Sequence, residues 1–114
     1  LLDAGARIGN GTDAPVEDVD PIASFHASVT RQPKSGSPFF PEQRMTRMEA
    51  LRSYTVANAY AAFEEGIKGT LAPGMLADVV VLSKDLSTVP DDEIPGTRVL
   101  ETVLGGKVVY EAAK

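Results

Sequence analysis

The chain has 114 residues and a mass of 12.1 kDa, the size of one domain. Its net charge of -5 disfavours nucleic acid as a partner, and no apolar run of about eighteen residues is present that would span a membrane. The absence of cysteine and the single histidine exclude disulfides, cysteine nucleophiles, thiolate metal sites and any site that needs two imidazoles from this chain. We expect a cytoplasmic protein.

The N-terminal residues combine a helix-ending pattern with a short extended one. Leu1 to Gly5 are typical of a last helical turn closed by a left-handed glycine. They contain neither an initiator methionine nor a signal-type segment, which leads us to expect a piece cut from a longer protein. Residues 6–12 are predicted to form a small strand whose glycines allow another backbone to approach closely. Asp13-Ala14-Pro15 ends this strand, because proline disfavours helix at the preceding residue.

Two amphipathic helices are predicted next. The first covers residues 21–31, since Asp20 is a favourable N-cap and Pro21 suits the first helical position. Its apolar face consists of Ile22, Phe25 and Val29. The second helix begins with a capping box, Thr46 to Glu49, and continues to about Phe63.

On the second helix, Met48 and Leu51 are expected to face a core, and Arg47 to face solvent. The connection between the helices, residues 32–43, contains three prolines and the pair Phe39-Phe40. It is predicted to be a loop, and its length allows a functional role. The phenylalanine pair could line a pocket or bind a partner, but packing back on the domain is the commoner arrangement and is the one expected.

After Gly66 the pattern becomes extended. Residues 78–82 read as a strand buried on both faces, because they form a continuous β-branched apolar run. Residues 90–94 are predicted to form one helical turn, and residues 98–104 and 107–110 a hairpin across Gly105-Gly106. The order of strand, helix, helix and three strands places the chain in the α/β class, with a boundary between residues 1–66 and 67–114.

Asp13 is the leading candidate for chemistry. It follows a predicted strand, and the carboxyl ends of strands are where α/β architectures gather ligands and catalytic groups. On position alone, a turn aspartate that hydrogen-bonds its own backbone is the commoner explanation. The acidic residues that follow do not have the spacing of a calcium loop and are better explained as a solvated loop with one helix cap. His26 is expected to be structural or surface-exposed.

Two stretches carry a family resemblance. Gly11 to Pro15, followed by Asp20-Pro21, resembles the segment around the last barrel strand of metal-dependent amidohydrolases, with a threonine at position 12 where members usually have serine. Lys68 to Leu82 resembles the closing signature of the same enzymes. The chain is most similar to amidohydrolase family three, the group that includes N-substituted formamide deformylase-like proteins, and the resemblance covers nearly its whole length.

The resemblance implies a C-terminal portion of a (β/α)₈ barrel, with its last strand and helices, plus strands of a small β-sandwich built from both ends of the chain. It implies zinc or a similar divalent metal, bound mainly by histidines from earlier strands. Asp13 alone is carried over from the family's site, as a metal ligand and as the general base in the complete enzyme. Its partners would be the remainder of the barrel and a small-molecule amide-type substrate. The 114 residues alone are expected to be inactive and to bind no metal tightly.

A non-catalytic structural or protein-binding module derived from such an enzyme is the alternative. A barrel strand and its helix, when separated from their neighbours, expose apolar surface and an unpaired edge. We therefore expect self-association of the chain in either case.

Overall fold

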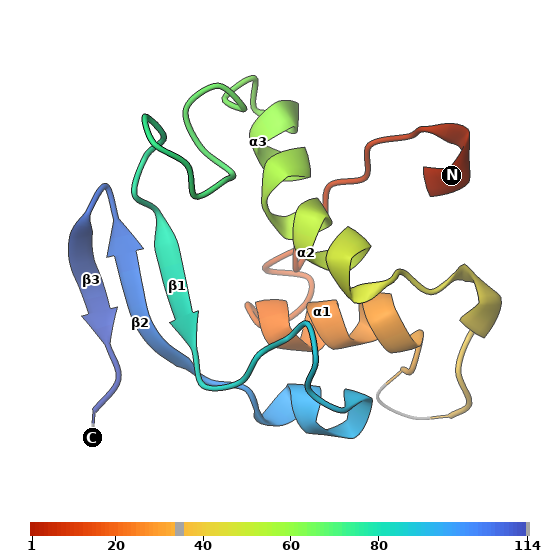
Figure 1. The fold of residues 1–114 in the computed structure, drawn as a ribbon. Helices are drawn as coiled ribbons and strands as arrows, with labels where there is room; N and C mark the ends of the chain where they lie inside the picture. The colour runs from red at the N-terminus through yellow and green to blue at the C-terminus, as the bar shows by residue number, and fades with distance from the viewer. Residues whose placement is uncertain (34–35, 114) are drawn as a thin grey trace.

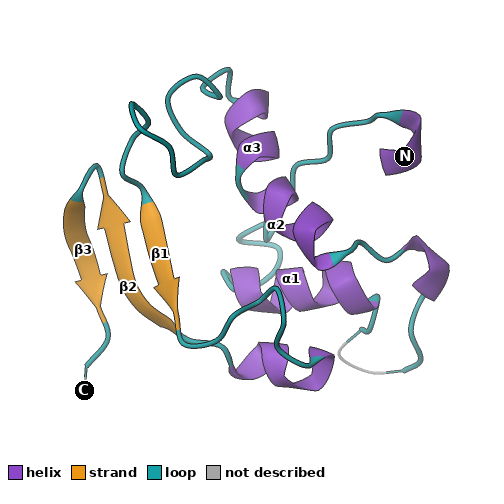
Figure 2. Ribbon diagram, in the orientation of Figure 1, coloured by secondary structure: helices purple, strands orange, loops and turns teal. Residues whose placement is uncertain are grey.

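The computed structural model describes residues 1–33 and 36–113, so part of the predicted loop 32–43 lies outside the described residues. The three α-helices lie in the first part of the chain, and the three strands, with one 3-10 helix between the first two, lie in the second (Figure 1). In chain order the elements are η1 (Leu2–Ala4), α1 (Pro21–Thr30), η2 (Pro41–Gln43), α2 (Arg47–Tyr54), α3 (Val56–Ala61), β1 (Val79–Leu82), η3 (Asp91–Gly96), β2 (Val99–Leu104) and β3 (Lys107–Glu111), where η marks a 3-10 helix. Figure 2 shows the strands together on one side and the helices on the other. The α/β class is confirmed.

Both predicted helix starts are confirmed, because each rests on local hydrogen bonds. The Asp20 carboxylate accepts hydrogen bonds from the main-chain N–H of Ile22 (3.0 Å) and of Ala23 (3.1 Å). At the start of α2, the Glu49 carboxylate accepts from the Thr46 N–H at 2.7 Å, and the Thr46 hydroxyl accepts from the Glu49 N–H at 3.3 Å. Side chains thus satisfy two main-chain N–H groups at the start of each helix.

The prediction that the second helix continues without a break to about Phe63 is wrong. Thr55 interrupts it with φ -122° and ψ -91°, and the chain continues as α3, which ends at Ala61. The Thr55 hydroxyl donates to the carbonyl of Leu51 at 2.8 Å, and the Thr55 N–H donates to Arg52 instead. A hydroxyl that bonds four residues back in this way competes with the helix ladder and bends helices.

The predicted strand over residues 6–12 is also not formed. A strand needs a neighbour to accept its ladder hydrogen bonds, and the described residues pair only β1, β2 and β3 with one another. Residues 6–12 instead run past the helices as an irregular segment. The predicted turn at Leu1 to Gly5 is present as η1, and Gly5 has a left-handed φ of +81°.

The sheet is antiparallel in the order β1-β2-β3. Gly105 and Gly106 have φ of +56° and +79°, the left-handed pair that a two-residue hairpin loop requires, so the predicted hairpin is confirmed. The predicted burial of β1 on both faces is wrong, since Val80 and Val81 are 52% and 42% exposed. Because consecutive side chains of a strand point to opposite faces, neither face of β1 is fully covered by the described residues.

The core lies between α1, α2 and η3. Its buried members are Phe25, Val29, Ala50, Leu86 and Ile94. Arg47, predicted to face solvent, lies over this core: its guanidinium donates to the carbonyls of Leu86 and Val89, both at 2.8 Å, and pairs with Asp91. Met48 is 57% exposed instead. The guanidinium thus satisfies three oxygens of the segment that delivers Ile94 to the core, which fixes the face that α2 presents.

Gly69 is the glycine whose replacement the packing opposes most directly. It has φ +98°, and a Cβ there would lie 2.9 Å from the Cβ of Ala59 and 3.2 Å from the Cα of Val56. We expect Gly69→Ala to lower the free energy of unfolding by about 2–4 kcal/mol through backbone strain and overpacking, measured by urea titration with circular dichroism. Gly66→Ala is the matched control, because a Cβ at Gly66 meets nothing within 4 Å. Equal effects of the two substitutions would contradict the packing.

The capping box makes the stability sensitive to acid. Hydrogen bonds from the Thr46 main-chain N–H and then from its hydroxyl lower the pKa of Glu49 below its ordinary value of 4.5. Because the folded-state pKa is the lower one, this contribution is fully present above pH 4.5 and is lost as pH falls through the folded-state pKa. We expect Glu49→Gln to flatten the fall in unfolding free energy below that pH. A variant with an unchanged pH slope would show that the cap does not form in solution.

Candidate functional site

Asp13 lies in a tight turn at the end of the 6–12 segment. Its φ is +56°, and its main-chain carbonyl accepts hydrogen bonds from the N–H of Val16 at 2.8 Å and of Glu17 at 3.3 Å. The residue therefore does form a turn, as the commoner explanation predicted, but it does so with its carbonyl rather than its carboxylate. The exposed carboxylate bonds to no other group among the described residues, and it is available to a ligand.

Asn10 holds the segment that carries Asp13. Its main-chain N–H donates to the carbonyl of Ser53 at 3.0 Å, and its own carbonyl accepts from the Nδ2 of Asn58 at 2.8 Å. Its side-chain Nδ2 lies 2.9 Å from the Oγ of Ser53 and 3.2 Å from the Oγ of Ser28. One residue is thus bonded to α1, α2 and α3. Our sequence reasoning missed it; the only signal is a lone amide between two glycines.

The two serine hydroxyls have defined roles in this cluster. Ser53 Oγ donates to the carbonyl of Ala50 at 2.7 Å, and Ser28 Oγ donates to the carbonyl of Ser24 at 3.0 Å. Each hydroxyl has one hydrogen, so both oxygens face Asn10 as acceptors. The cluster therefore requires a side chain at position 10 that donates twice.

Gly9 explains how Asn58 reaches the segment. A Cβ on Gly9 would overlap the Oδ1 of Asn58. The glycine does permit a close approach, as the sequence predicted, but the approaching group is a side chain and not a strand backbone.

The other candidate residues do not join Asp13. Asp20 is committed to the N-cap of α1, and Asp18 is exposed. His26 is half-buried, and its carbonyl accepts from the Thr30 hydroxyl at 2.7 Å within α1. Within residues 1–33 and 36–113 there is no group of three or more histidine, aspartate or glutamate side chains that could hold a metal ion. Protein metal centres usually have at least three protein ligands, so the described residues do not by themselves form such a centre at Asp13.

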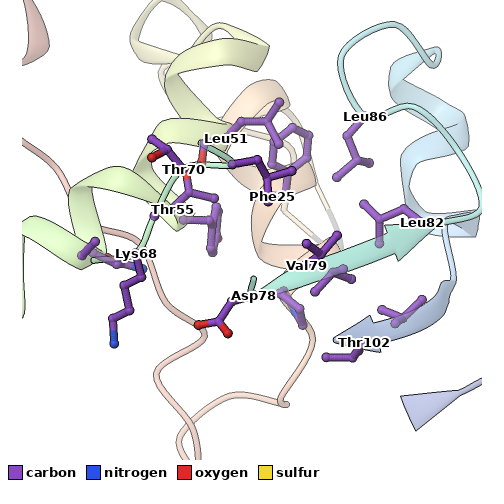
Figure 3. A pocket seen from close by; sticks show the side chains of 18 of the residues that line it. Phe25, Leu51, Thr55, Lys68, Thr70, Asp78, Val79, Leu82, Leu86 and Thr102 are labelled. Carbon is purple, nitrogen blue, oxygen red and sulfur yellow. Dashed lines mark hydrogen bonds between the residues drawn. The ribbon is translucent and has the colours of Figure 1, made fainter. Parts of the chain in front are cut away.

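A cavity of about 710 Å³ lies between the helices and the sheet (Figure 3), and Asp13 is not among the residues that line it. Its wall is mainly apolar and includes Phe25, Leu51, Val79, Leu82 and Leu86, while Lys68 and Asp78 lie together at one side (Figure 3). The Asp78 carboxylate accepts from the N–H of Gly105 at 2.7 Å, and Lys68 pairs with Glu64. Both charged groups are therefore satisfied within the chain.

Exposed aromatic rings lie at the loop 32–43. Phe39 and Phe40 are 63% and 50% exposed and pack edge-on against each other with centroids 4.5 Å apart. The expectation that this pair packs back on the domain is wrong; Phe39 instead lies beneath the guanidinium of Arg31.

No helix in the described part of the chain is long and apolar enough to cross a membrane.

Comparison with known proteins gives consistent results. Residues 1–110 match the amidohydrolase family. The chain is 36% identical to Protein LONG AFTER FAR-RED 3 of Arabidopsis thaliana, 32% identical to N-substituted formamide deformylase of Arthrobacter pascens, and 30% identical to the putative amidohydrolase YtcJ of Bacillus subtilis strain 168. These alignments cover 96%, 97% and 97% of this chain but only 19%, 20% and 22% of the relatives, so the chain spans about a fifth of their length.

Two solved structures share the fold. An amidohydrolase from Thermotoga maritima MSB8 aligns with a TM-score of 0.75 and 20% identity over 98% of this chain and 25% of that one. Guanine deaminase of E. coli aligns with a TM-score of 0.68 and 18% identity over 99% of this chain and 30% of that one. At these identities the likeness is one of fold.

Proposed function

This chain belongs to the amidohydrolase family, and from that membership we propose that it is the C-terminal part of a metal-dependent hydrolase that acts on amide-type C–N bonds. The observation that carries the proposal is the family match over residues 1–110, which includes Asp13. Two of the similar proteins are named for the removal of a formyl group from N-substituted formamides and for the deamination of guanine, both hydrolyses of C–N bonds.

Asp13 is the catalytic residue in this proposal. A divalent metal such as zinc supplies a bound water whose pKa is near 7. Asp13 would hold the metal through its carboxylate, accept the proton of that water and deliver it to the leaving amine. The exposure of this carboxylate and its freedom from other bonds among the described residues support the assignment.

The rest of the parent enzyme supplies what the described residues lack. In this proposal residues 1–66 contribute the last part of a (β/α)₈ barrel with its loop and helices, and residues 67–114 contribute strands of the small sandwich. The exposed valines of β1 support it, since a further layer can pack against them.

A non-catalytic binding module is the second candidate. It is favoured by the number of large apolar side chains exposed on the sheet and at Phe39-Phe40. It differs from the first candidate in requiring neither a metal nor the Asp13 carboxylate.

Asp13→Asn in the complete enzyme tests the catalytic proposal. The amide keeps the shape of the carboxylate but neither accepts a proton nor carries charge, so we expect kcat/KM on an N-substituted formamide to fall at least about 1,000-fold. Metal content, measured by atomic emission, should fall as well. Asp3→Asn, at an exposed aspartate in η1, is the matched control with unchanged activity.

The outcomes separate the two candidates. An Asp13→Asn enzyme with full activity and full metal content would contradict the catalytic proposal. A complete protein that holds no metal and hydrolyses no amide would contradict the catalytic proposal and support the non-catalytic binding module. For the 114 residues alone we expect no hydrolysis and only weak zinc binding by calorimetry; tight stoichiometric zinc would contradict the single-ligand assignment.

The exposed edge strand β3 leads us to expect that the 114-residue chain self-associates. It lies at the end of the sheet order, at the outer edge in Figure 1, and all five of its residues are exposed. If two copies pair antiparallel about Val109, Lys107 lies opposite Glu111 of the second copy, so both ends of the ladder carry opposite charges. We expect a dimer by light scattering.

Charge variants test this pairing. Lys107→Glu places like charges opposite each other and should weaken the dimer, whereas Lys107→Glu combined with Glu111→Lys should restore it. A monodisperse wild-type monomer, or a dimer that is indifferent to Lys107→Glu, would contradict pairing through β3.

A further inference from the structure

We propose that Asn10 is a positioning residue for Asp13. Its side-chain amide donates two hydrogen bonds that hold residues 6–13 to the helices, and this fixes the position of the Asp13 carboxylate. This inference rests on the proposed function of Asp13 and adds the group that determines where its carboxylate lies.

The connection between the two residues is short. Only Gly11 and Thr12 separate Asn10 from Asp13, and three residues span at most about 10 Å even when fully extended. On the other side, the next attachment to a helix is the N-cap at Asp20. Asp13 therefore lies close to one anchor and further along the chain from the other, so a shift of Asn10 is carried to Asp13.

The anchor is specific in polarity. The hydroxyl hydrogens of Ser28 and Ser53 are directed to helix carbonyls, which leaves their oxygens as acceptors at 3.2 and 2.9 Å from Asn10 Nδ2. Ser53 is only 3% exposed, so water does not readily replace a lost partner there. An aspartate of the same shape as Asn10 would place carboxylate oxygens against two acceptor oxygens and be repelled.

A second attachment acts on the main chain. Asn58 donates from α3 to the carbonyl of Asn10, and the missing Cβ of Gly9 makes room for it. The segment is thus held through a side chain on one side and through its backbone on the other. Such doubled fixation keeps a following residue within the small displacement that catalysis tolerates, because a shift of about 1 Å can cost about 100-fold in rate.

Asn10→Asp in the complete enzyme tests the proposal. We expect kcat to fall about 10- to 100-fold while KM stays within about threefold, because the base is displaced but the substrate contacts remain. Ile94→Val is the matched control for general destabilisation: it removes a buried methylene in η3 and should lower the thermal midpoint while leaving kcat within about twofold. A structural role alone would give both variants the same pattern.

Gly9→Ala provides a second test if Asn10→Asp does not fold. It keeps Asn10, displaces Asn58 and should lower kcat about 3- to 10-fold. The positioning role is overturned, and the catalytic proposal stands, if Asp13→Asn abolishes activity while kcat is unchanged in folded Asn10→Asp. If Asn10→Asp does not fold, an unchanged kcat in Gly9→Ala overturns the positioning role in the same way. If Asp13→Asn itself is fully active, the proposed function fails instead.

Discussion

The hydrogen bonds of Asn10 hold residues 6–13 to the helices, and the Arg7 guanidinium, 3.9 Å from the ring centroid of Tyr60 in α3, adds a second contact. A segment of this kind is ordinarily fixed by the ladder of a sheet, in which each residue shares the load with its neighbours. Here no strand among the described residues pairs with this segment. The side-chain amide, main-chain N–H and main-chain carbonyl of Asn10 form hydrogen bonds to the helices instead. Because the bonds extend to α1, α2 and α3, the same contacts also hold the three helices at fixed positions around the segment.

The rest of the structure consists of a small core and large uncovered surfaces. Few apolar side chains are fully buried, and they cluster where η3 and the guanidinium of Arg47 close the helical half. The sheet, by contrast, exposes valines of both β1 and β3. A chain that spans about a fifth of its relatives' length is consistent with this imbalance, since residues that face solvent in 114 residues become interior when further layers are added.

Local chemistry made parts of this fold predictable. Asp20, the Thr46–Glu49 box and the Gly105-Gly106 loop each act within a few residues, so their effect can be derived from spacing alone. The resemblance to amidohydrolases likewise rests on contiguous motifs, and the family match confirms this resemblance.

Features that depend on distant neighbours were not predictable in this way. The helix break at Thr55 comes from a choice between two hydrogen bonds that the sequence does not rank. The inward position of Arg47 depends on carbonyls about forty residues away, at Leu86 and Val89. Asn10 escaped notice for the same reason, because its serine partners lie on two separate helices and no spacing rule connects them.

Hydrogen exchange at the main-chain N–H of Asn10 tests whether residues 6–13 are held to the helices, because this N–H is bonded to the carbonyl of Ser53. We expect the Asn10 main-chain N–H to exchange as slowly as that of Ala50 within α2, and at least about 100-fold more slowly than that of the exposed Val19. An Asn10 main-chain N–H that exchanges as fast as that of Val19 while that of Ala50 is protected would show that residues 6–13 are not held to the helices.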